Sequence, residues 1–123
     1  MNLEECYAAF GGSYEEIKEH LQGDALIERF LIKFLSDKSY ETLKEAVQEE
    51  NYEGAFRAVH TLKGICLNLC FAKLSSSCCE MTELLRNYEQ GVDKEACQAI
   101  WKQVSADYAE VVDVIQKFVE ENQ

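Results

Sequence analysis

Apolar side chains recur at spacings of three and four residues along most of the chain, which is the pattern of amphipathic helices. Residues of the kind that cap helices precede these stripes and divide the chain, namely Ser13, Asp24, Ser39, Asn51 and Asp93. The pattern predicts long helices over residues 24–49, 52–70, 72–90 and 93–122. A polar run at 36–39 can divide the first of them into two, and residues 2–21 are expected to form short helices.

Short connections between long amphipathic helices favour antiparallel neighbours. We therefore predict an all-α fold, an up-and-down four-helix bundle with short additional N-terminal helices that cover one end. The chain of 123 residues contains no proline, which agrees with a helical class. Its length suits one domain with a hydrophobic core, so residues 1–123 are expected to form a single unit.

The charge and hydropathy of the chain limit its partners. A formal net charge of −11 disfavours nucleic acid and anionic membrane surfaces. No apolar run approaches the roughly 20 residues that span a bilayer, and the acidic first ten residues do not resemble a secretory signal. We expect a soluble, cytoplasmic monomer.

Six cysteines stand in the chain, and none forms a C-x-x-C pair. A zinc site would need further ligands, and only His20 and His60 could supply imidazole. Free cysteine is among the most buried residue types, so small apolar core residues are the favoured interpretation. A cysteine-based metal or redox module stays open as an alternative, although we expect no metal.

The stretch from residue 52 to residue 70 carries the candidate chemistry. Viewed down its axis, the apolar residues gather on one side, and His60 lies almost opposite their centre. The imidazole is therefore expected to project into solvent from the middle of a helix. Histidine has an unperturbed pKa of about 6.5, so a neutral, nucleophilic ring is available near neutral pH.

The neighbours of His60 on the predicted helix suit a phosphoryl group. Side chains of a helix lean toward its N-terminus, so residues one turn later lean over the imidazole. At that place Gly64 has no side chain, although a mid-helix glycine costs about 1 kcal/mol relative to alanine. Lys63 can bring its ammonium to a phosphoryl group on the ring, and Arg57 is a second nearby cation.

Three apolar residues, Phe56, Leu67 and Phe71, fall on or beside the face of His60. Apolar side chains around a reactive group indicate a docking patch for a partner protein, to which Arg57 would also belong. Packing of Phe56 and Leu67 against a neighbouring helix is the alternative.

The run His60-Thr61-Leu62-Lys63-Gly64, followed by Asn68-Leu69, resembles the signature of histidine-containing phosphotransfer (HPt) domains. The resemblance is sharp over about residues 55–85. The chain departs from the family pattern at Cys70, where glycine is usual, and at Met81-Thr82, where the facing helix often carries Leu-Glu. Thr82 and Cys79 are polar residues of that helix that could contact the imidazole.

The resemblance implies a four-helix bundle that serves as an intermediate in a multistep phosphorelay of two-component signal transduction. His60 would carry the phosphoryl group, Lys63 would assist it and Gly64 would leave it accessible. The partners would be response-regulator receiver domains or a hybrid histidine kinase. The receiver would bring magnesium and most catalytic groups, so this chain would need no cofactor and have no kinase activity of its own. A helical module that binds a receiver or another signalling protein without carrying phosphate remains the alternative.

Overall fold

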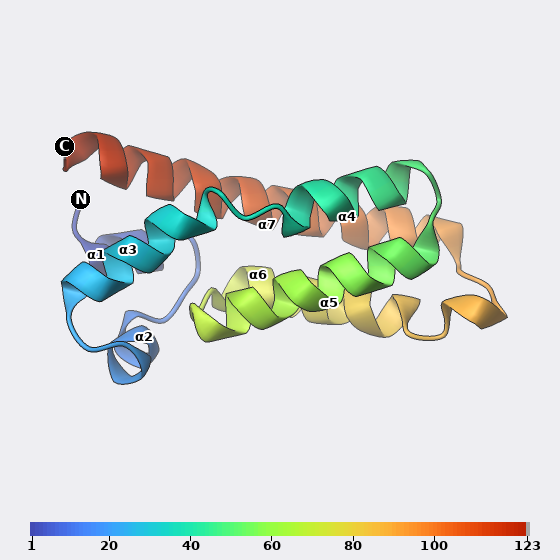
Figure 1. The fold of residues 1–123 in the computed structure, drawn as a ribbon, viewed down its shortest axis with the longest axis horizontal. Helices are drawn as coiled ribbons and strands as arrows, with labels where there is room; N and C mark the ends of the chain where they lie inside the picture. The colour runs from blue at the N-terminus through green and yellow to red at the C-terminus, as the bar shows by residue number, and fades with distance from the viewer. Residues whose placement is uncertain (123) are drawn as a thin grey trace.

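Helices make up the regular structure of the computed structural model, which describes residues 1–122. No strand occurs in that part of the chain, so the predicted all-α class is confirmed. Figure 1 shows the helices in chain order. They are α1 (Leu3–Ala9), α2 (Tyr14–His20), α3 (Asp24–Phe34), α4 (Ser39–Gln48), α5 (Tyr52–Asn68), α6 (Ala72–Leu85), the 3-10 helix η1 (Tyr88–Gln90) and α7 (Lys94–Glu121).

Side-chain caps start three of these helices as the sequence predicts. The side chain of Asn51 accepts a hydrogen bond from the Gly54 amide, Asp93 accepts one from Ala96, and Ser13 accepts one from Glu16. Each bond satisfies a backbone donor that the first turn of a helix leaves unpaired. Asp24 and Ser39, by contrast, are the first residues inside their helices, and neither of these helices has a side-chain cap.

Two helix boundaries refine the predicted elements. The predicted break near residues 36–39 is confirmed, because α3 ends at Phe34 and α4 begins at Ser39. The stretch 72–90 is not one helix: α6 ends at Leu85, and the separate 3-10 turn η1 follows it. The chain therefore changes direction earlier than the apolar pattern indicates.

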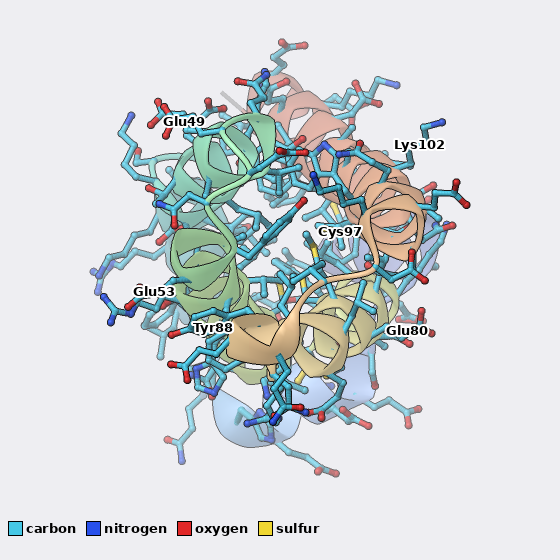
Figure 2. The ribbon with its side chains drawn as sticks, turned by 90° about the vertical axis from the view of Figure 1, so that its right-hand side faces the viewer. Glu49, Glu53, Glu80, Tyr88, Cys97 and Lys102 are labelled. Carbon is cyan, nitrogen blue, oxygen red and sulfur yellow. The ribbon has the colours of Figure 1, made fainter. Side chains whose placement is uncertain are left out.

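Helices α4, α5, α6 and α7 pack along their lengths. Helix α5 packs against both α4 and α6, and α6 packs against α7. In Figure 1 these helices share the long axis of the molecule, and Figure 2 shows them nearly end-on around a filled interior. Apolar side chains from every α-helix fill that interior, each stabilising the fold by about 1.5–3 kcal/mol when fully buried. No helix of residues 1–122 has both the length and the apolar character to cross a membrane.

Helices α1 to α3 cover the end of the bundle where α5 turns into α6. Tyr7 donates a hydrogen bond to the Leu69 carbonyl at 2.9 Å, and the Ser13 amide donates one to the Cys70 carbonyl at 3.0 Å. Cys70 has φ 58°, a left-handed conformation that favours glycine. The helix end thus keeps the backbone shape that glycine would adopt, although a cysteine stands there. These contacts fix the far end of α5, eight residues beyond His60.

Candidate functional site

His60 stands on the outer side of α5, as the helical pattern predicts. Its side chain is exposed, whereas the opposite side of the same helix is buried. The buried residues of α5 are Ala55, Ala58, Val59, Leu62 and Cys66. Within residues 1–122 the structure records no hydrogen bond or ion pair to the His60 ring. The imidazole is thus presented by a helix whose other face is anchored in the core.

Gly64, one turn after His60, leaves open space beside the ring. A Cβ built on Gly64 meets no side chain or neighbouring backbone within 4 Å. Its backbone has no positive φ, so the helix does not require glycine there. Neither packing nor backbone geometry explains this glycine, and open space above the imidazole is the feature that it provides.

Lys63 is half-buried on the side of α5 that faces the C-terminal part of α6. No carboxylate of the described residues forms an ion pair with its ammonium. Glu83 is near enough for the charge to matter: a hydrogen bond from Arg86 lowers the pKa of the Glu83 carboxyl, and the Arg86 and Lys63 charges lower it further. Lys63 thus follows His60 by one turn of α5, and its ammonium has no ion-pair partner among residues 1–122.

The predicted docking residues divide into three that reach the surface and one that does not. Phe56 is half-buried, with its ring centroid 6.0 Å from that of His60. Leu67 is 51% exposed, so its side chain is available for contact with a partner. Arg57 is exposed, and its guanidinium pairs with Glu53 at 2.6 Å, one turn away from His60 toward the start of α5.

The prediction that Phe71 belongs to the docking surface is wrong. Its side chain is fully buried, with ring centroids of Phe10 and Phe34 at 5.0 and 5.1 Å. Helix α5 ends before Phe71, and the left-handed backbone at Cys70 turns the chain inward. Phe71 is therefore a core residue that holds the N-terminal helices against the bundle.

Sequence reasoning missed three residues near Phe56 and Lys63, the neighbours of His60 on α5, namely Glu83, Arg86 and Tyr88. The Arg86 guanidinium lies over the Phe56 ring, 5.8 Å from its centroid, and the Tyr88 ring lies 6.1 Å from Phe56 on another side. Antiparallel packing of the two helices, which the sequence predicts, already places the residues after 82 alongside the first half of α5. Without the exact helix ends that packing could not select these residues.

The polar residues of α6 that could contact the imidazole do not do so. Thr82 is fully buried, and its hydroxyl donates to the Cys78 carbonyl at 2.7 Å. Cys79 is partly exposed, and no hydrogen bond between it and His60 is recorded in residues 1–122. The ring contact recorded for His60 within residues 1–122 comes from Phe56 of α5 itself.

The six cysteines are free thiols in this structure, and five of them are buried. A hydrogen bond to Cys78 and burial both raise the pKa of the Cys66 thiol, which keeps it protonated. Cys70 contacts the ring of His20, with Sγ and Nδ1 3.5 Å apart. In the described chain no three histidine, cysteine or acidic side chains are arranged to hold a metal ion.

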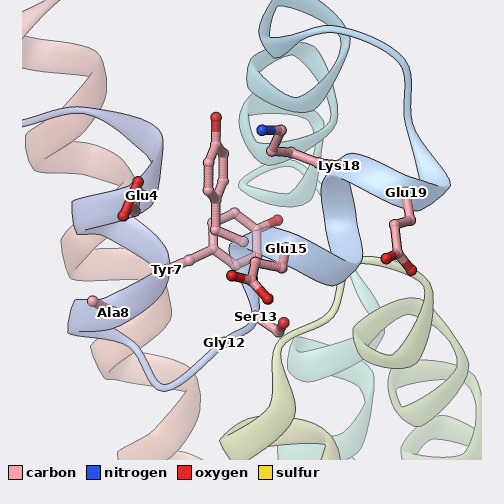
Figure 3. Close-up of a pocket in the computed structure, with 9 residues that line it drawn as sticks. Glu4, Tyr7, Ala8, Gly12, Ser13, Glu15, Lys18 and Glu19 are labelled. Atoms are coloured by element: carbon pink, nitrogen blue, oxygen red, sulfur yellow. The ribbon is translucent and has the colours of Figure 1, made fainter.

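A surface hollow of about 770 Å³ has no residue of α5 in its lining. It is formed by α1, α2 and the segment between them, and Figure 3 shows Glu4, Glu15 and Glu19 around it with a single cation, Lys18. Its acidic lining does not suit a phosphoryl group, so the open face of α5 is the candidate site for one.

A family model described as Hpt domain matches residues 31–121. The chain belongs to the Hpt domain family. The match begins inside α3 and covers α4 to α7, and it leaves α1 and α2 outside. Searches of curated proteins and of solved structures each gave no significant match. Hpt domains are helical bundles that take part in phosphorelays with receiver domains and kinases, which agrees with a helical scaffold that presents one histidine.

Proposed function

We propose that this chain is the histidine phosphotransfer component of a multistep phosphorelay. It carries a phosphoryl group on His60 to or from the aspartate of a receiver domain. The observation that carries the proposal is the exposed imidazole of His60, with open space over Gly64 and Lys63 one helical turn away on α5. The Hpt membership of the chain supports it at the level of the family.

The reaction needs little catalytic machinery from this chain. A nitrogen of the neutral imidazole attacks the phosphorus of an aspartyl phosphate; the N–P bond forms as the P–O bond to the receiver carboxylate breaks. Transfer onward reverses these steps. The receiver domain is expected to bring the magnesium ion, so this chain acts as a carrier without cofactor or kinase activity of its own.

The residues around His60 have separate roles in this proposal. Lys63 offsets the dianionic charge of the phosphoryl group by charge-assisted hydrogen bonding. Gly64 leaves room for the phosphoryl group and the receiver's acidic site to approach the ring. Phe56 and Leu67 supply apolar contact area for the receiver, and Arg57 extends that surface at its edge. Helices α4 to α7 serve as the up-and-down four-helix scaffold, and the chain works as a cytoplasmic monomer.

A label-transfer experiment tests the proposal. The chain is incubated with a receiver domain that carries radioactive phosphate on its aspartate, and we expect label to appear on this chain in a base-stable, acid-labile bond. His60→Gln should take no label. His20→Gln is the matched control, because His20 is the second of the two histidines in the chain and should be dispensable.

The outcomes separate the two functional hypotheses. Transfer of label to wild type and to His20→Gln, but not to His60→Gln, supports the carrier. Label that still moves to His60→Gln, or no transfer to wild type from any receiver that binds it, refutes the carrier. Binding of a receiver without transfer would instead support an interaction module.

A further inference from the structure

Glu83 and Arg86 form a two-point ion pair at the end of α6. The Arg86 Nε donates to Glu83 Oε2 at 3.1 Å, and its Nη2 donates to Oε1 at 2.8 Å. This is the planar fork by which guanidinium binds carboxylate or phosphate. Both side chains are exposed, so the pair contributes little to stability and can open at low cost.

The Glu83–Arg86 pair and the imidazole of His60 are both neighbours of the Phe56 ring. The guanidinium lies over one side of the Phe56 ring, and the His60 ring is also next to Phe56. Lys63, which follows His60 by one turn, acts on Glu83 from α5. The Glu83 carboxylate thus pairs with Arg86 and is also stabilised by the more distant charge of Lys63.

We propose that Glu83 is a built-in counter-ion that the phosphoryl group on His60 displaces. In the unphosphorylated protein Glu83 holds Arg86 over Phe56. After transfer, the guanidinium leaves Glu83 and binds oxygens of the phosphoryl group together with Lys63. The exchange makes and breaks only hydrogen bonds and ion pairs. This inference rests on the proposed function and names a device that regulates the same site.

The direction of the exchange follows from charge. A phosphoryl dianion has three acceptor oxygens and about twice the charge of a carboxylate, so it competes well for one guanidinium. Glu83 therefore acts through Arg86 as a positioning residue. It keeps the guanidinium extended near the site before transfer, and afterwards it competes for Arg86, so the phosphoryl group stays loosely enough held to move on.

Four variants test this exchange: Glu83→Gln, Arg86→Ala, the double variant, and Glu80→Gln as a control. Glu80 is exposed on α6 about one turn before Glu83, so its substitution removes the same charge from the same helix. Each variant is mixed with a phosphorylated receiver, and the fraction of label on histidine is measured at equilibrium. An equilibrium fraction is insensitive to how well the two proteins dock.

We expect Glu83→Gln to shift the equilibrium toward phosphohistidine by about two- to fivefold, the range that loss of one exposed competitor allows. Glu80→Gln should match wild type, and Glu83→Gln should have no effect in the Arg86→Ala background. An effect that persists without Arg86 would show simple charge repulsion and overturn the exchange. So would equal behaviour of Glu83→Gln and Glu80→Gln.

A spectroscopic reading checks the same step. In the wild-type protein, the NMR signal of the Arg86 Nε–H group should shift on phosphorylation, because its acceptor changes from carboxylate to phosphoryl oxygen. An unchanged signal in a labelled protein would refute the exchange alone. A wild-type chain that takes no label would refute the proposed function, and the exchange with it.

Discussion

Substitutions of Gly64 should have opposite effects on phosphotransfer at His60 and on the stability of the fold. It lies in the middle of α5, where alanine is a better residue for the helix. A Cβ at this position meets nothing within 4 Å, so Gly64→Ala introduces no clash. The substitution places a methyl group in the open space beside the His60 ring. Gly64→Gln places a longer side chain there at a similar helix propensity.

The effect on stability is predicted from helix propensity alone. Alanine is favoured over glycine in a helix interior by about 1 kcal/mol. For a domain of this size, that gain raises the melting temperature by about 4 °C. Gly54→Ala is the matched contrast on the same helix. Its Cβ would lie 2.6 Å from the Asn51 side chain, which caps α5, so that variant should gain less stability or lose some.

Phosphotransfer should respond in the opposite direction. Transfer requires an in-line approach to the imidazole, and small displacements of reacting groups are costly. We expect Gly64→Ala to slow transfer from a phosphorylated receiver by about three- to tenfold and Gly64→Gln by about 100-fold.

The assays are chemical denaturation and label transfer under single-turnover conditions. Wild-type transfer rates for both Gly64 variants would refute the role given to the open space. A loss of stability in Gly64→Ala would show instead that the glycine serves packing.

The remaining predictions address single side chains. Lys63→Ala should lower the rate of His60 phosphorylation by about tenfold, measured by label transfer, while the melting temperature stays within about 2 °C of wild type. Phe71→Ala should lower the free energy of unfolding by about 3–5 kcal/mol, because it leaves an internal cavity. Leu67→Ala should change that free energy by no more than about 0.5 kcal/mol but should weaken receiver binding. Denaturant titration measures the first effect, and calorimetry of receiver binding measures the second. Burial raises the pKa of the Cys6 thiol from 9.0 to about 11. The unfolded chain therefore loses this proton first, so the contribution of Cys6 to stability should be full below pH 9 and be lost from pH 9 to 11; in reducing buffer, a denaturation midpoint that does not fall over pH 9 to 11 would contradict this.

The sequence alone determined where the helices lie and which way His60 points. Apolar periodicity places one face of α5 in the core, and a residue opposite that face must point outward whatever packs on the core side. Asn51 and Asp93 mark helix starts because their side chains satisfy local backbone donors, and this requires no distant contact. The missing side chain of Gly64 is likewise read from the sequence, whereas the structure shows that no other element fills the space above it.

Only the tertiary structure decided what surrounds that face. Phe71 could not be placed by extending the α5 pattern, because the left-handed turn at Cys70 takes the chain off the helical path. Arg86, which pairs with Glu83, lies over the Phe56 ring because α5 and α6 pack against each other. Periodicity gives the direction of a side chain about its own axis. The distance to a neighbouring helix depends on turns, helix ends and core packing, which involve residues far apart in the sequence.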